Sequence, residues 1–77
     1  MSDQWADVLL HVNETLDEGS LRRLEDEINE NVGVMGVAHH PRRPHLLKVD
    51  YDAEISRPQE FLRPIRRQGL HAQLVGL

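Results

Sequence analysis

Four histidines and one aspartate are the side chains of this sequence best suited to binding a metal ion. They are His39, His40, His45, His71 and Asp17. Imidazole nitrogen and carboxylate oxygen suit Zn(II), Ni(II) or Cu(II), so these residues are candidate ligands if the fold brings them together. No standard zinc-ligand spacing appears among them. Arg42 and Arg43 lie inside the histidine segment and would repel a cation, which favours surface histidines over a site.

Other reactive groups are missing from the chain. The absence of cysteine excludes disulfides, thiolate metal sites and thiol catalysis. There is no glycine-rich phosphate loop, and no serine that the pattern brings beside a histidine and an acid. We therefore expect a protein that is not an enzyme and that holds no cofactor other than one of these ions.

Size and charge limit the remaining classes. A chain of 77 residues forms one small domain, spanning residues 1–77. Its net charge of −4 disfavours nucleic acid as a partner. No apolar run approaches the roughly 20 residues that span a bilayer, and the first residues, MSDQ, lack the features of a secretory signal. We expect a cytoplasmic monomer that does not enter the membrane.

The elements that must position the candidate ligands begin with a half-buried strand over residues 7–12, where Val8, Leu10 and Val12 alternate with residues of the other face. A helical period follows. Its apolar stripe consists of Leu21, Leu24, Ile28 and Val32. Thr15 and Glu18 have the spacing of a capping box, which predicts that Thr15 caps this helix. The carboxylate of Asp17 is expected to interact favourably with the positive end of the helix dipole. Gly33 is expected to end the helix.

The second half repeats this plan. Residues 34–40 and 46–52 predict two strands, and HHPRRPH, residues 39–45, predicts a loop between them because its prolines remove backbone donors. Ser56, Pro58 and Gln59 indicate the start of a second helix. Its inward residues are expected to be Phe61, Leu62 and Ile65, with Pro64 weakening one turn. A short strand containing Ala72 and Leu74 follows Gly69.

The resulting order is βαββαβ. With right-handed crossovers it predicts an α+β fold: a four-stranded antiparallel sheet with both helices on one face and a mostly polar open face. The loop before the first helix, the central hairpin and the loop after the second helix then share one end of the sheet. This topology would allow the candidate ligands to approach one another.

The chain resembles the heavy-metal-associated domain family, which has the ferredoxin-like fold of copper chaperones and of the N-terminal modules of metal-pumping ATPases. The matching residues are Val12 in the first strand, Leu24 and Ile28 in the helix, Gly33-Val34, Tyr51-Asp52 and Gly69. Leu70 departs from the family's pattern, which has an aromatic residue or lysine after this glycine. The family's metal motif, a methionine followed by Cys-x-x-Cys, falls on Thr15, Asp17 and Ser20. None of these is the soft ligand that Cu(I) prefers.

The resemblance implies a metal-binding or metal-transport accessory domain that works without a thiol site, together with a protein partner such as a metal-transport protein. The alternative is a metal-independent protein-interaction or regulatory module. Acidic residues on the first helix and arginines on the second fit either mutual attraction of the helices or a docking face for a partner.

Overall fold

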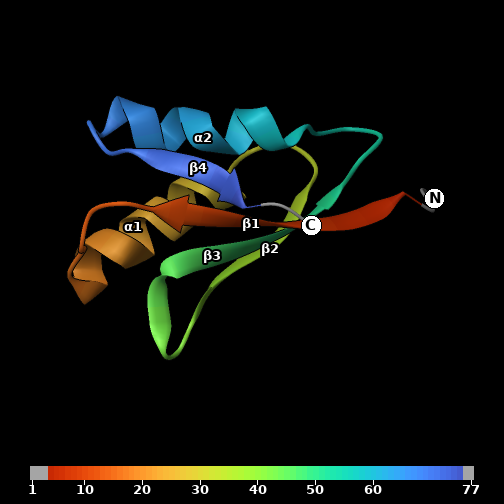
Figure 1. Cartoon of the computed structure of the whole chain (residues 1–77). Coiled ribbons are helices and arrows are strands. Elements are labelled where there is room, and N and C mark those ends of the chain that lie inside the picture. Colours follow the sequence, from red (N-terminus) through yellow and green to blue (C-terminus); the bar gives the residue numbers. More distant parts are fainter. Residues whose placement is uncertain (1–3, 76–77) are drawn as a thin grey trace.

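A computed structural model describes residues 4–75 of the chain and shows one four-stranded antiparallel sheet with two helices (Figure 1). The elements, in chain order, are β1 Trp5–Val12, α1 Glu18–Asn29, β2 Val34–His40, β3 Arg43–Asp52, α2 Pro58–Arg67 and β4 Ala72–Val75. The strands lie in the order β2-β3-β1-β4, with every neighbouring pair antiparallel. This arrangement confirms the predicted α+β, ferredoxin-like fold.

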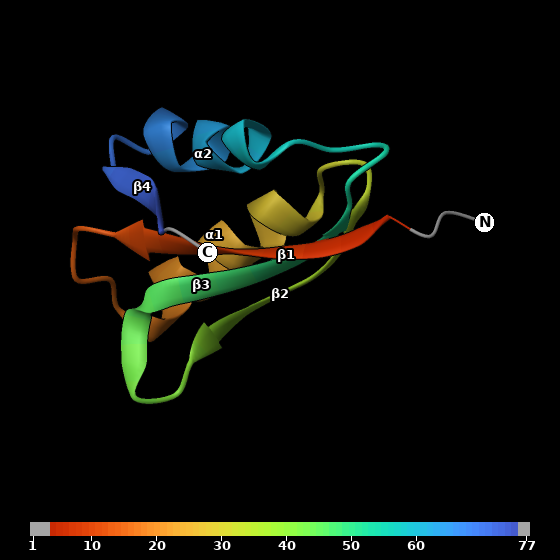
Figure 2. The ribbon, with the colours of Figure 1, turned by 45° about the vertical axis from the view of Figure 1, so that its right-hand side comes forward.

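Both helices pack on the same face of the sheet (Figure 2) because each carries an apolar stripe that meets the inward side chains of the strands. The buried residues of the strands are Val8, Leu10, Val12, Leu47, Val49 and Tyr51. Those of the helices are Leu21, Leu24, Ile28, Phe61, Leu62 and Ile65. At the centre, the rings of Tyr51 and Phe61 meet edge to face, with their centroids 5.1 Å apart. The predicted inward residues of β1 and of both helices are thus confirmed, with the exception of Val32.

The boundaries of α1 differ from the prediction at both ends. Its N-cap is Asp17, not Thr15, since the Asp17 carboxylate accepts a hydrogen bond from the Ser20 backbone N–H at 2.7 Å. The helix ends at Asn29, four residues before Gly33. Val32, predicted to be inward, is 79% exposed. Gly33 has a φ of +94° and leads into β2 instead of ending the helix.

The start of α2 also differs from the prediction. Arg57, not Ser56, is the N-cap, and the Glu60 carboxylate accepts a hydrogen bond from the Arg57 backbone N–H at 3.0 Å. Ser56 is buried, and its hydroxyl donates to the Val32 carbonyl oxygen. That bond ties the segment before α2 to the connection between α1 and β2.

The hairpin between β2 and β3 is tighter than the predicted loop over residues 39–45. β2 runs to His40 and β3 starts at Arg43, so the turn holds only two residues. The register shifts between His39, opposite Leu47, and His40, opposite Arg43. Residues 44–46 therefore bulge out of the β2–β3 pairing, which accommodates Pro44 within a strand because its missing N–H has no pairing to break.

Candidate functional site

Three segments meet at one end of the sheet: residues 13–17 after β1, the turn between β2 and β3, and residues 68–71 before β4 (Figure 1). Antiparallel strand order dictates this meeting, because β1 and β2 end where β3 and β4 begin. We call this region the loop end. It carries most of the candidate ligands.

The first contact at the loop end is a clasp between Glu14 and His71. One carboxylate oxygen of Glu14 accepts from the His71 backbone N–H at 2.8 Å, and the other lies 2.7 Å from His71 Nδ1. The backbone N–H of Asn13 also donates to the His71 carbonyl oxygen at 2.8 Å. The side-chain and backbone hydrogen bonds from His71 lower the pKa of Glu14 by stabilising its carboxylate. Two loops far apart in the sequence are thereby joined.

The second contact is centred on His45, which the bulge in β3 brings beside the end of β1. His45 Nδ1 lies 2.7 Å from the Val12 carbonyl oxygen. A carbonyl oxygen only accepts, so Nδ1 is the donor, and in the neutral ring Nε2 carries the lone pair. Nε2 lies 3.5 Å from the Thr15 hydroxyl, and the ring stacks on that of His11 with centroids 5.7 Å apart.

The remaining candidate ligands make separate contacts. Asp17 caps α1, and its hydrogen bond from the Ser20 backbone lowers its pKa. His39 Nδ1 lies 3.0 Å from a carboxylate oxygen of Glu25 on α1. His40 Nδ1 accepts from the Arg42 backbone N–H at 3.1 Å, within the hairpin turn.

The loops therefore meet as predicted, while their candidate ligands are distributed among different partners. Within residues 4–75, no three histidine, aspartate or glutamate side chains are grouped closely enough to hold a metal ion. Sequence reasoning missed Glu14 and Glu25 as histidine partners. It had no signal for them, since Glu14 lies 57 positions from His71 and Glu25 lies 14 from His39.

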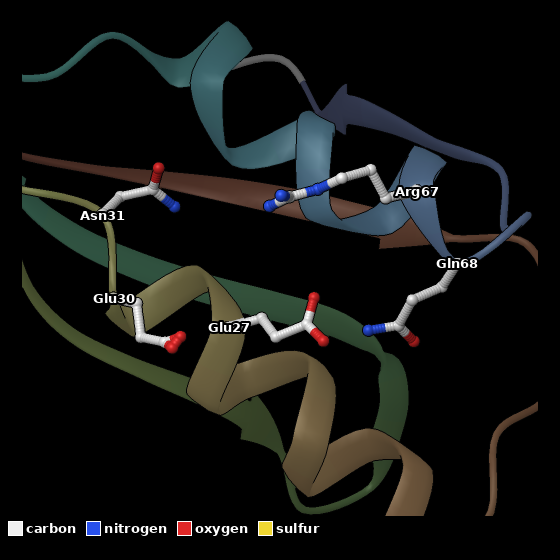
Figure 3. Close-up of a pocket in the computed structure, with 5 residues that line it drawn as sticks. All are labelled: Glu27, Glu30, Asn31, Arg67 and Gln68. Carbon is white, nitrogen blue, oxygen red and sulfur yellow. The ribbon is translucent and has the colours of Figure 1, made fainter.

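The outer surface of the helices is strongly charged. Exposed acidic residues of α1 include Glu18 and Asp26, whereas α2 exposes Arg63, Arg66 and Arg67. Figure 3 shows a pocket between the two helices, lined by Glu27, Glu30, Asn31, Arg67 and Gln68. In the part of the chain that the structure describes, no ion pair joins the two helices. Glu25 of α1 pairs with His39, whereas Glu18, Asp26 and the α2 arginines take part in no ion pair among residues 4–75 and are available to another molecule.

Two further observations concern the described residues. No helix within residues 4–75 is long and apolar enough to cross a membrane. Of their exposed large hydrophobic residues, only Trp5 is aromatic.

The fold is that of heavy-metal-associated domains, and this chain contains no cysteine. Several solved structures share it. Oxidized MerP from Ralstonia metallidurans superposes with a TM-score of 0.82 at 15% identity, covering 94% of this chain and 99% of its own. The apo copper chaperone of Enterococcus hirae superposes with a TM-score of 0.77 at 18% identity, covering 88% of this chain and 98% of its own. A copper-binding domain from HMA7, a P-type ATPase, superposes with a TM-score of 0.79 at 13% identity, covering 91% of this chain and 93% of its own.

No protein-family model and no curated protein sequence matches this chain. The likeness to the solved structures therefore rests on the arrangement of the backbone, and at these identities it establishes the fold alone.

Proposed function

We propose that this chain is a non-enzymatic accessory domain of metal transport, located in the cytoplasm, which has kept the fold of metal-binding domains while giving up their thiol ligands. The observation that carries this proposal is the contrast between the fold and the loop. The fold matches copper-binding domains along nearly their whole length, yet the loop that would carry thiols holds a helix cap at Asp17.

The chemistry of the loop argues against Cu(I) as the cargo. Cu(I) prefers thiolate and thioether donors, whereas Thr15, Asp17 and Ser20 offer hydroxyl and carboxylate oxygen. The Asp17 carboxylate already accepts a hydrogen bond from the Ser20 backbone N–H, so a metal ion bound there would compete with the helix cap. Among the histidines of the loop end, His45 keeps the Nε2 lone pair of its neutral ring, and within residues 4–75 no two further donors lie close enough to share an ion with it.

The charged helix faces support the role of a protein partner. The arginines of α2 and the acidic residues Glu18 and Asp26 of α1 are exposed, and no ion pair among the described residues joins the two helices. Unpaired surface charges of this kind steer the encounter of two proteins even where they add little to stability. The partner we propose is a metal-transport protein that presents a domain with complementary charge.

The test uses the isotope-labelled chain and the copper-binding domain of a P-type ATPase, in its apo and copper-loaded forms. We expect amide shifts in α1 and α2 that diminish with added salt, because exposed charges are screened. Arg63→Gln with Arg66→Gln should weaken the interaction several-fold. Arg42→Gln with Arg43→Gln removes the same charge from the hairpin and serves as the matched control.

A competition experiment tests whether Cu(I) is a metal ion that this domain carries. Against a Cu(I) chelator under anaerobic conditions, the chain should release Cu(I) completely, because it has no thiolate. Stoichiometric retention of Cu(I) would contradict the loss of the thiol function. If the amides of α1 and α2 do not shift with either form of the ATPase domain, the docking role is contradicted and a metal-independent interaction module is favoured.

A further inference from the structure

A concave surface lies on the face of the sheet opposite the helices, next to the hairpin. Three of its residues, Leu46, His11 and Val75, come from the neighbouring strands β3, β1 and β4. The hairpin turn and the first residues of β3 supply Arg42, Arg43, Pro44 and His45, and β4 also supplies Gln73. We call this surface the hairpin hollow.

The floor of the hairpin hollow contains two aliphatic side chains, Leu46 and Val75, on a face that the sequence predicts to be mostly polar. His11 lies opposite Leu46 on one side and Gln73 on the other. In the next row, Val75 lies opposite Leu9, which is 37% exposed. Neighbouring strands are about 4.8 Å apart, so three strands form a floor about 10 Å wide. That width suits one aliphatic side chain.

The charge of the hairpin hollow has a single sign. Arg42 and Arg43 line it and no acidic residue does, although the chain contains 13 aspartates and glutamates. Neither guanidinium takes part in an ion pair among residues 4–75. The acids closest to the middle of the open face, Asp7 and Asp50, lie 3.6 and 3.7 Å from the Lys48 ammonium.

We propose that the hairpin hollow binds an acidic, leucine-containing peptide segment of a partner protein. The aliphatic side chain packs against Leu46 and Val75, and the neighbouring carboxylates pair with Arg42 and Arg43, whose planar guanidinium groups match carboxylate geometry. The stacked rings of His11 and His45 form a flat side wall. This inference goes beyond the proposed function, because it involves neither a metal nor the charged faces of the helices.

The experiment titrates the isotope-labelled chain with two capped peptides. One has two leucines flanked by glutamates, and the other has glutamine in place of each glutamate. We expect the glutamate peptide to shift the amides of residues 42–46 and of β4, and the glutamine peptide to bind about tenfold more weakly at low salt, as expected for the loss of two exposed charge pairs.

Two variants and one control locate the interaction. Arg42→Gln with Arg43→Gln should weaken binding of the glutamate peptide about tenfold, again by loss of two charge pairs. Val75→Asp, on the edge strand β4, should weaken it further by repelling the carboxylates. Arg22→Gln with Arg23→Gln removes an equal charge from the exposed surface of α1 and, at about 0.1 M salt, should leave binding within about twofold, because exposed charges beyond a Debye length of about 10 Å are screened.

Several results would overturn the proposal. Equal binding of the two peptides would show that the arginines do not recognise carboxylate. Equal losses in the hairpin variant and the α1 control would indicate non-specific attraction to positive charge. Shifts of residues 42–46 that grow with protein concentration alone would assign the hairpin hollow to a second copy of the chain. Shifts caused by phosphatidylserine vesicles but not by the peptide would assign it to a membrane surface.

Discussion

Glu14 and His71 join the loop after β1 to the loop before β4, through two hydrogen bonds to one carboxylate. The pair lies at the surface, with the His71 side chain 76% exposed, so solvent screens its charge. Its main effect is therefore to hold the two loops in register. Protonation of the Glu14 carboxylate would weaken its hydrogen bonds with His71, so the clasp depends on pH.

We predict that Glu14→Gln lowers the stability of the protein modestly at neutral pH and hardly at all in acid. The folded-state pKa of Glu14 lies below its usual value because of the hydrogen bonds from His71. Its contribution is therefore complete above the unfolded-state pKa and is lost as pH falls through the lowered folded-state pKa, from about pH 5 downward.

Urea unfolding of both proteins between pH 3 and 6 measures this difference. Asp26→Asn, at an exposed position of α1, is the matched control and should show no such convergence. A gap between Glu14→Gln and the unmodified protein that widens in acid would contradict the assigned sign.

Asp17 gives a second prediction at the scale of the residue. Asp17→Ala removes the cap of α1 and should lower the melting temperature by a few degrees, whereas Asp17→Asn keeps a capping side chain and should lower it less. Thr15→Ala should change the stability by no more than about 0.5 kcal/mol, since its hydroxyl makes only the long contact to His45. Thermal unfolding of the three variants measures the order. A larger loss of stability for Thr15→Ala than for Asp17→Ala would show that Thr15 is the N-cap.

At the scale of the element, the connections explain where sequence reasoning succeeded and failed. The alternation of β1 and β3 and the helical period of α1 and α2 identified the core, because burial imposes a period on the chain. The same period extended α1 wrongly to Val32, since an apolar residue at helical spacing does not reveal that the backbone has already turned. Similarly, nothing local distinguishes Thr15 from Asp17 as the cap, because both are good capping residues.

The connection between α1 and β2 depends on Gly33. Its φ of +94° is a conformation that side chains with a Cβ rarely adopt, and an added Cβ would lie 2.9 Å from Ile55 Cγ2 and closer still to the Ser56 hydroxyl. Gly33→Ala should therefore destabilise the protein by more than the roughly 1–2 kcal/mol of the left-handed conformation alone.

Gly36→Ala provides the matched control, because a Cβ there meets no atom within 4 Å. That substitution should be close to neutral, since β2 then gains a residue that is better suited to a strand. Chemical denaturation of both variants compares them directly. Equal effects would show that the connection can adjust to a side chain at position 33.

At the scale of the whole molecule, topology brings together residues that no local pattern connects. The βαββαβ order correctly predicted that three loops share one end of the sheet. It could not predict side-chain pairing there, because the bulge over residues 44–46 turns His45 toward Val12 and the long-range contact with Glu14 holds His71. The two aliphatic side chains of the hairpin hollow were missed for a related reason: Leu46 and Val75 come together only once the strand order is known.

The distribution of the histidines leads to a last prediction, concerning divalent metals. His39 contacts Glu25, His45 contacts Val12 and His71 contacts Glu14, so their imidazoles are already held by different elements. Gathering them around one ion would break these contacts, and Arg42 and Arg43 would repel the ion. Titration with Zn(II) or Ni(II) should therefore give weak, scattered amide shifts that diminish below about pH 6, as imidazoles become protonated.

The matched variants for this titration are His40→Ala and His45→Ala. Scattered binding predicts that each removes only its own local shifts, because an isolated surface imidazole binds independently of the others. A shared site predicts one saturable transition with a 1:1 stoichiometry, abolished by either substitution. That second outcome would require the hairpin to move toward the loop after β1, and it would establish a relocated, thiol-free metal site at the loop end.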